Sequence, residues 1–230
     1  MRMILIFIFS SLFLGCGSGK QTPVVSRLSS DEMASLGAEH SRFERSEDPA
    51  FSVETHFAAG QLAESQGACS RAAQQYRAAL KLEPKHRPSL YRLALVCTQM
   101  RDFPTAIELW RQYVEITGRE ASAYGNLGFC YELAGQLAEA EAAYKLGIER
   151  DGKNGACRVN YGLLLARQNR PTEAIAQLRA VLTEAQAHYN LGSLYEQMGR
   201  REQAKAEYRR AVEAEPGLMD AHARLATLEQ

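Results

Sequence analysis

Residues 124–148 read YGNLGFCYELAGQLAEAEAAYKLGI, and residues 188–212 read HYNLGSLYEQMGRREQAKAEYRRAV. Both segments place Asn-Leu-Gly near the start, a glycine in the middle, and an alanine and a tyrosine after it at identical spacings. Self-similarity at a fixed spacing is the sequence signature of repeat architectures. Extending the alignment outward from these two segments gives a period of 34 residues over most of the chain.

The period divides the chain into five repeats and a final half-repeat. The repeats cover residues 53–86, 87–120, 121–154, 155–184 and 185–218, and residues 219–230 form the half-repeat. The fourth repeat has 30 residues, four fewer than the period. We number positions from 1 at the first residue of each repeat.

Three positions carry the strongest pattern. Position 8 is always small: Gly60, Ala94, Gly128, Gly162, Gly192 and Ala226. Position 20 is always alanine: Ala72, Ala106, Ala140, Ala174 and Ala204. Position 24 is large: Tyr76, Trp110, Tyr144, Leu178 and Tyr208. This spacing predicts two antiparallel helices per repeat, because small residues let the backbones approach and the large side chain fills the space beside them.

The connections between the two helices also follow a pattern. Gly67, Gly135 and Gly199 stand where a left-handed residue is expected to end the first helix. Asn169 takes the same place in the fourth repeat and adopts that conformation readily, whereas Arg101 in the second repeat does so less willingly.

This pattern resembles the tetratricopeptide repeat, and the two segments quoted at the outset match it best. The resemblance covers residues 53–218. It implies an all-α fold: a right-handed superhelical solenoid of helix pairs, with a concave groove lined by the first helices. Residues 219–230 are then expected to form a capping helix.

The first twenty residues, MRMILIFIFSSLFLGCGSGK, predict an export signal. Arg2 precedes a 12-residue apolar run, which is shorter than the ~20 residues that a membrane-spanning helix needs. The run ends in Leu-Phe-Leu-Gly-Cys, which resembles the bacterial lipobox and implies cleavage before Cys16 and its lipidation by palmitate-type chains. We expect a signal peptide at 1–15, and a lipidated tether with a lead-in helix at 16–52. The alternatives are an ordinary signal peptide and an uncleaved anchor.

Composition and motifs argue against several functional classes. The chain has 27 basic and 27 acidic residues, so no broad positive field favours nucleic acid. It contains no Cys-x-x-Cys, Gly-x-Ser-x-Gly or His-Glu-x-x-His motif, and its five histidines lack metal-ligand spacing. We therefore expect no enzymatic activity, cofactor, metal or small-molecule substrate. The minor alternative is an enzyme with catalytic residues scattered over the groove, where the charged candidates are Arg92, Arg167 and Glu196.

Four cysteines remain after Cys16. An oxidising envelope compartment permits disulfides, and repeat geometry places Cys69 and Cys97 at the same edge of the solenoid. They form the candidate disulfide, because bridging requires Cα atoms within ~7 Å. The alternative is that all four cysteines are small buried hydrophobes.

The concave face of the first helices is the candidate partner-binding groove. In tetratricopeptide repeats this face is formed by positions 2, 5, 6, 9, 12 and 13. In this chain position 6 is Asn in the third, fourth and fifth repeats. An Asn amide pairs with an extended peptide backbone whatever the peptide's side chains are, although an Asn ladder that stabilises neighbouring helices is the alternative. The predicted groove residues are Phe57, Tyr91, Arg92, Leu95, Asn126, Phe129, Asn160, Leu163, Arg167, Tyr189 and Asn190.

These observations predict a membrane-anchored scaffold for protein–protein interaction. The resemblance to lipoproteins extends to those of the tight-adherence (Flp) pilus system, through a lipidated Cys before repeats and a shortened late repeat, and to pilotins that guide secretins of type IV pili. It implies pilus or secretin assembly, with the protein lipid-anchored in the outer membrane and facing the periplasm. The alternatives are an adaptor for periplasmic enzymes such as cell-wall hydrolases, and a scaffold facing the cytoplasm.

Overall fold

The computed structural model describes residues 51–230, which form eleven helices and no strand. The helices are α2 (Val53–Ser65), α3 (Cys69–Leu82), α4 (Arg87–Gln99), α5 (Phe103–Ile116), α6 (Ala121–Leu133), α7 (Leu137–Arg150), α8 (Gly155–Arg167), α9 (Pro171–Arg179), α10 (Glu184–Gln197), α11 (Arg201–Ala214) and α12 (Met219–Glu229). The expectation of an all-α fold built from helix pairs is confirmed. The predicted signal peptide, Cys16 and the lead-in helix lie outside the described residues.

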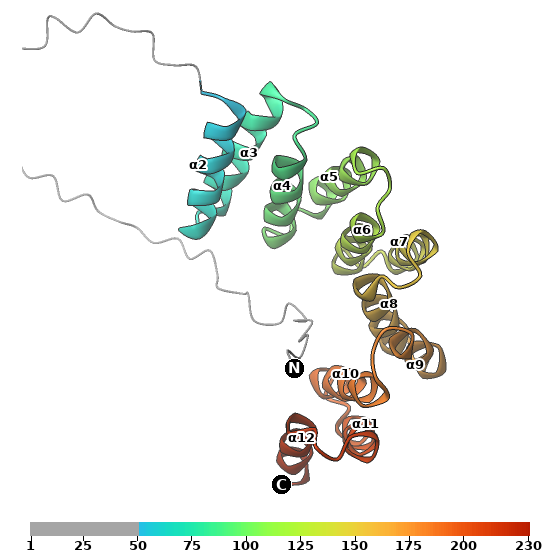
Figure 1. Cartoon of the computed structure of the whole chain (residues 1–230). Coiled ribbons are helices and arrows are strands. Elements are labelled where there is room, and N and C mark those ends of the chain that lie inside the picture. The colour runs from blue at the N-terminus through green and yellow to red at the C-terminus, as the bar shows by residue number, and fades with distance from the viewer. Residues whose placement is uncertain (1–50) are drawn as a thin grey trace, which may run out of the picture. The chain divides into compact units, whose positions relative to one another are not determined.

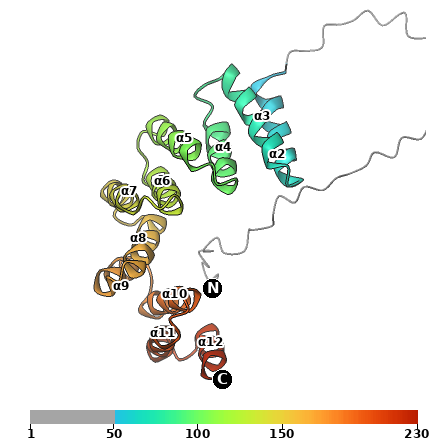
Figure 2. The same cartoon turned by 180° about the vertical axis from the view of Figure 1, so that it is seen from behind.

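The described chain forms two compact units. Residues 51–89 contain the helix pair α2–α3, and residues 90–230 contain most of α4 and the helices that follow it, up to α12. Within the second unit the helices alternate between two layers: α4, α6, α8, α10 and α12 line the inner side of an arc, and α5, α7, α9 and α11 form its outer side (Figures 1 and 2). We call the side lined by the first helices, from α4 to α12, the inner face.

Local signals in the sequence begin and end these helices. Asn154 accepts a hydrogen bond from the Cys157 amide at 3.0 Å before α8, and Thr183 forms a capping box with Gln186 before α10. Left-handed residues end several first helices: Gly67, Gly135 and Gly199 have φ of 70°, 77° and 70°, and Arg101 and Asn169 have φ of 61° and 62°. A further left-handed pair after α5, Gly118 and Arg119 with φ of 67° and 64°, was not expected from the repeat pattern.

The core of each repeat lies where position 24 meets position 8. Tyr76, Tyr144, Leu178 and Tyr208 are 0% exposed and Trp110 is 2% exposed. A Cβ atom on Gly128 would lie 2.6 Å from Cε1 of Tyr144, so the ring occupies the space that a side chain would need. Complete burial of a large apolar side chain stabilises a fold by roughly 1.5–3 kcal/mol, which makes position 24 the main packing residue of each repeat.

The fourth repeat departs from the others in its second helix. Helix α9 has 9 residues, whereas α3, α5, α7 and α11 each have 14. After Arg179 the chain turns at once, with the Leu182 amide donating to the Leu178 carbonyl at 2.9 Å. The missing residues therefore come from the end of the second helix.

Candidate binding face

The three asparagines at position 6 lie on successive inner helices. Asn126 is on α6, Asn160 on α8 and Asn190 on α10, and all three are half-buried. Asn190 Nδ2 donates to the Gln186 carbonyl of its own helix at 2.8 Å. Within residues 51–230 the side chains of Asn126 and Asn160 have no hydrogen-bond partner. The described residues therefore contain no asparagine ladder, and two amides keep their donors and acceptors for a ligand.

Three of the four aromatic residues predicted for the groove pack against the core of their own repeat. The Tyr91 ring lies 5.4 Å from the Trp110 ring and 5.5 Å from the Tyr113 ring, centroid to centroid. The Tyr189 ring lies 5.6 Å from that of Tyr208. In residues 51–89, the Phe57 ring lies 5.7 Å from that of Tyr76. Each is half-buried, so packing against position 24 fixes the ring and leaves part of it exposed.

The remaining predicted residues differ in how much surface they offer. Leu95, Phe129, Arg92 and Arg167 are half-buried. Leu163 is only 3% exposed, because position 9 of α8 packs into the core. Among the predicted apolar residues of the inner face it therefore offers the least surface to a partner.

A hydrogen bond links position 12 of the first helix to position 24 of the second in four repeats. The Tyr144 hydroxyl donates to Glu132 Oε2 at 3.1 Å, and that of Tyr208 donates to Glu196 Oε2 at 2.7 Å. Tyr76 makes the same bond to Glu64. In the second repeat Trp110 Nε1 lies 3.5 Å from Thr98 Oγ1. The fourth repeat has Ala166 and Leu178 at these positions, and its two helices meet there through apolar contact.

Two of these glutamates also form ion pairs with the next inner helices. Glu132 Oε1 pairs with Arg167 Nη1 of α8, and the side chains are 12% and 36% exposed. Glu196 Oε1 lies 3.5 Å from Arg224 Nη1 of α12. Burial raises the pKa of Glu132, although Arg167 and the Tyr144 hydroxyl oppose that effect. Each pair places opposite charges together on the inner face.

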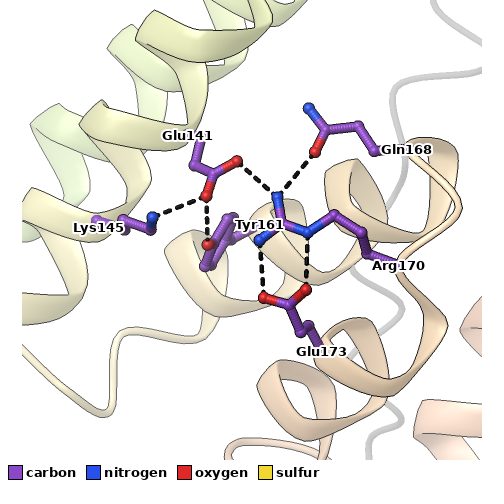
Figure 3. A network of polar contacts seen from close by, with 6 residues as sticks. All are labelled: Glu141, Lys145, Tyr161, Gln168, Arg170 and Glu173. Carbon is purple, nitrogen blue, oxygen red and sulfur yellow. Dashed lines mark hydrogen bonds and ion pairs between the residues drawn. The ribbon is translucent and has the colours of Figure 1, made fainter.

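A second polar network joins the third and fourth repeats (Figure 3). Glu141 on α7 accepts hydrogen bonds from the Tyr161 hydroxyl on α8 and from Arg170 Nη1 before α9, both at 2.9 Å. It also pairs with Lys145 at 2.7 Å, and Arg170 holds Glu173 through two bonds of 2.7 Å. The hydrogen bond from Lys145 has the largest effect on the pKa of Glu141 and lowers it. Burial opposes this effect, and the hydrogen bonds from Arg170 and Tyr161 lower the pKa further, to about 2.

A shallow pocket of about 260 Å³ lies beside this network, lined by Lys145, Ile148, Glu149, Arg158, Tyr161 and Gln177. Arg158 is already bound to protein atoms, because Nε donates to the Gly152 carbonyl at 2.6 Å and Nη1 donates to Gln177 Oε1 at 2.7 Å. No group of three or more potential metal ligands occurs among residues 51–230. In the same range no helix has the length and apolar character needed to cross a bilayer.

The cysteines of the described chain are mostly core residues. Cys97, Cys130 and Cys157 are buried, and Cys130 and Cys157 are free thiols. Burial raises the pKa of Cys157 to about 11, so its reactive thiolate form is suppressed at neutral pH. Cys69 and Cys97 lie in different units, and their disulfide stays a prediction.

Part of the chain is similar to curated proteins of known sequence. General transcriptional corepressor ssn6 of Schizosaccharomyces pombe is 27% identical over 116 residues, which are 50% of this chain and 10% of that protein. Tetratricopeptide repeat protein 7B of Homo sapiens is 28% identical over 97 residues, or 42% of this chain and 12% of that protein. The chain thus spans about a tenth of the length of these curated relatives.

Solved structures with the same fold cover more of the chain. TTC0263 of Thermus thermophilus, a thermophilic TPR protein, has a TM-score of 0.55 and 23% identity over 77% of this chain and 98% of that one. YrrB, described as a TPR protein with an unusual peptide-binding site, has a TM-score of 0.54 and 22% identity over 77% and 94%. MamA reaches a TM-score of 0.58 with 21% identity over 71% and 92%. At these identities the likeness concerns the fold.

Family models of the tetratricopeptide repeat match residues 57–118 in one case, and residues 121–154 and 185–217 in another, together more than half of the chain. These ranges contain the close contact of positions 8 and 24 in the first, third and fifth repeats. The chain therefore belongs to the tetratricopeptide repeat family, whose repeats are scaffolds for protein–protein interaction.

Proposed function

We propose that this protein is a lipid-anchored scaffold that holds an extended peptide segment of a partner protein on the inner face. The amides of Asn126 and Asn160, which have no partner within the described chain and stay accessible to water, are the observation that carries the proposal. An amide that has no partner inside the protein can exchange its water for the backbone groups of a bound peptide. The peptide-binding site described for YrrB, a protein of the same fold, supports such a role.

The inner face is a better candidate than the outer side of the second helices. The basic residues of α11 are engaged on the protein's own surface: Lys205 pairs with Glu202 at 3.0 Å, and Arg209 pairs with Glu229 at 2.7 Å. Glu141 likewise is fully engaged with its neighbours. Polar groups that are already paired offer a partner less than the open amides do.

The location that we propose follows from the N-terminal sequence. The Leu-Phe-Leu-Gly-Cys segment resembles a lipobox, and anchoring through Cys16 would hold the repeats at the periplasmic side of the outer membrane. The partner class proposed on the same resemblance is a secretin or pilus subunit. A short second helix in the fourth repeat is consistent with it, since α9 has 9 residues.

Comparison of membrane cross-linking patterns tests the peptide-binding role. The full chain and a variant with Asn126, Asn160 and Asn190 changed to Ala are cross-linked in native membranes, and the partners are identified by mass spectrometry. A matched control changes three exposed amides on second helices, Gln74, Gln112 and Gln203, to Ala. We expect partners to be lost from the asparagine variant alone. An identical partner set for all three proteins would refute binding through the inner face, and the partner's identity separates a secretin or pilin from a cell-wall hydrolase.

Substitution of Cys16 tests the anchor separately. A Cys16→Ser variant should keep its signal peptide, lose the mass of the acyl chains and no longer incorporate labelled palmitate. If the variant is processed and membrane-bound like the wild type, the lipoprotein assignment is wrong.

A further inference from the structure

The charges of the inner face are paired within the protein between α6 and α12. Five charged residues stand at positions 2, 5, 6, 9, 12 and 13 of α6, α8, α10 and α12, and four of them form the pairs Glu132–Arg167 and Glu196–Arg224. The fifth, Asp220, stands in the first turn of α12, at the last helix of the row. The middle of the inner face therefore has no net charge.

Hydrogen bonds from buried tyrosines hold both glutamates in place. Glu132 accepts from Tyr144 and Glu196 accepts from Tyr208, and these two tyrosines are fully buried. A ligand carboxylate that approached Arg167 would have to displace a glutamate fixed on two sides. A ligand ammonium that approached Glu132 would meet the Arg167 guanidinium. Either charge would lose water without gaining a free partner, and such a loss is costly.

The groups that stay available are uncharged. The Asn126 and Asn160 amides have no partner in the described chain, and Ser193 lies half-buried at position 9 of α10. Phe129 is half-buried and Leu133 is 44% exposed on α6, which adds an apolar area beside the amides. This combination can bind backbone amides and apolar or small polar side chains.

The spacing of the helices sets the length of the segment. Packed helices lie roughly 8–10 Å apart, so α6, α8 and α10 together extend over roughly 20 Å. An extended peptide rises about 3.3 Å per residue and would cross them in about six residues.

We infer that the inner face selects an extended peptide segment that has no charged side chains over about six residues. This inference rests on the proposed function and adds the chemical class of the ligand. Recognition then depends on hydrogen bonding and shape, and binding should change little with salt, since long-range charge attraction does not contribute.

Selection from peptide pools tests the inference. The detergent-solubilised full chain is immobilised and offered three pools of random eight-residue peptides with acetylated and amidated ends: an uncharged pool, one with two Asp or Glu, and one with two Lys or Arg. Bound peptides are quantified by mass spectrometry at low and at physiological salt. We expect the uncharged pool to be retained about tenfold better than either charged pool, because a charged peptide would bury at least one charge without a partner. Retention of the uncharged pool should depend little on salt. Better retention of a charged pool would overturn the inference.

Removal of one positive charge from the inner face should change which peptide pool is bound best. Arg167→Gln leaves Glu132 without its cation, so this variant should enrich the basic pool relative to wild type. Arg209→Gln is the matched control, because Arg209 pairs with Glu229 on the exposed surface of α11 and α12. A basic preference in the control, or none in Arg167→Gln, would contradict the assignment of charge neutrality to the Glu132–Arg167 pair.

A variant with Asn126 and Asn160 changed to Ala distinguishes failure of this inference from failure of the proposed peptide-binding function. If wild type prefers a charged pool and the preference disappears when Asn126 and Asn160 are changed to Ala, the inner face binds peptides and only the charge class is wrong. If no pool is retained, or if retention is unchanged in that variant, both the peptide-binding role and the inference fail.

Discussion

The third and fourth repeats are neighbours, but the two helices within each repeat are joined in different ways. In the third, Tyr144 fills the space above Gly128 and ties its helix to Glu132 by a hydrogen bond of 3.1 Å. In the fourth, Leu178 fills the space above Gly162 and no such bond can form, because position 12 is Ala166. Its second helix is also shorter.

Three polar contacts of the fourth repeat reach back to the third. Tyr161 and Arg170 both donate to Glu141 of α7, and Arg167 pairs with Glu132 of α6. Because each unit of a solenoid contacts its neighbours and little else, stability is the sum of internal and interface contributions. The third repeat is tied internally through Tyr144 and Glu132, whereas the fourth, whose own helices are joined by the Arg158–Gln177 hydrogen bond, depends in addition on its interface with the third.

The largest effect is expected from removing the core side chain of the third repeat. Tyr144→Ala should destabilise it by about 3–5 kcal/mol, the range for loss of a large buried aromatic ring. Tyr144→Phe keeps the ring and loses only the bond to Glu132, so it should cost about 1.5–3 kcal/mol. Hydrogen exchange measured by mass spectrometry on α6 and α7 locates the loss. Equal effects of the two substitutions would show that the hydrogen bond, and not packing, dominates.

The second-largest effect on stability is expected when the fourth repeat is given the glutamate at position 12 and the tyrosine at position 24 that the third repeat has. Ala166→Glu alone buries a carboxylate without its tyrosine, and Leu178→Tyr alone buries a hydroxyl without its glutamate, so each should destabilise. The double variant should recover about 1.5–3 kcal/mol relative to the sum of the single effects. A double-mutant cycle on urea unfolding measures this coupling. A coupling near zero would mean that the short α9 cannot bring position 24 to position 12.

Glu141 should make the interface of the two repeats sensitive to pH. Its pKa in the folded protein is lowered to about 2, from an ordinary value of 4.5. A lowered pKa contributes stability that is fully present above about pH 4.5 and is lost as the pH falls through about 2. Glu141→Gln should therefore be less stable than wild type by about 1–2 kcal/mol at neutral pH. The difference should disappear once the pH is below the lowered pKa.

Comparing wild type with Glu141→Gln cancels the titration of other carboxylates. Glu132, whose pKa is raised by burial, acts with the opposite sign and is present in both proteins. Urea midpoints and the exchange rates of α8 and α9 amides, recorded across this pH range, give the difference. A difference that stays constant with pH would show that the charge of Glu141 contributes nothing to the interface.

Sequence reasoning reached the helix pairs because their determinants are local. Gly67, Gly135 and Gly199 predict the left-handed ends, and the small residue at position 8 predicts the close contact with position 24. The bond between positions 12 and 24 was missed, although a signal was present. Glutamate stands at position 12 in the three repeats whose position 24 is tyrosine, and in none of the others.

The contacts between repeats could not be predicted in this way. The Glu132–Arg167 pair joins residues 35 apart, and the Arg170–Glu141 bond joins residues 29 apart. Both contacts depend on how far neighbouring helices are shifted relative to each other along their axes. The periodicity of the sequence does not determine this shift. For the same reason Leu163 was assigned to the inner face from its position, whereas its side chain is 3% exposed.

The smallest effect is expected from the other carboxylate that Arg170 holds. Glu173 accepts two hydrogen bonds from Arg170, but it lies on the same exposed helix end, within three residues. Exposed pairs of this kind contribute little, because water solvates both charges when they separate. Glu173→Gln should therefore leave the urea midpoint and α9 exchange within error of wild type, since Arg170 keeps its bond to Glu141 across the repeats. If Glu173→Gln destabilises α9 as much as Glu141→Gln does, the fourth repeat is held by its own local contacts, and its dependence on the third repeat is disproved.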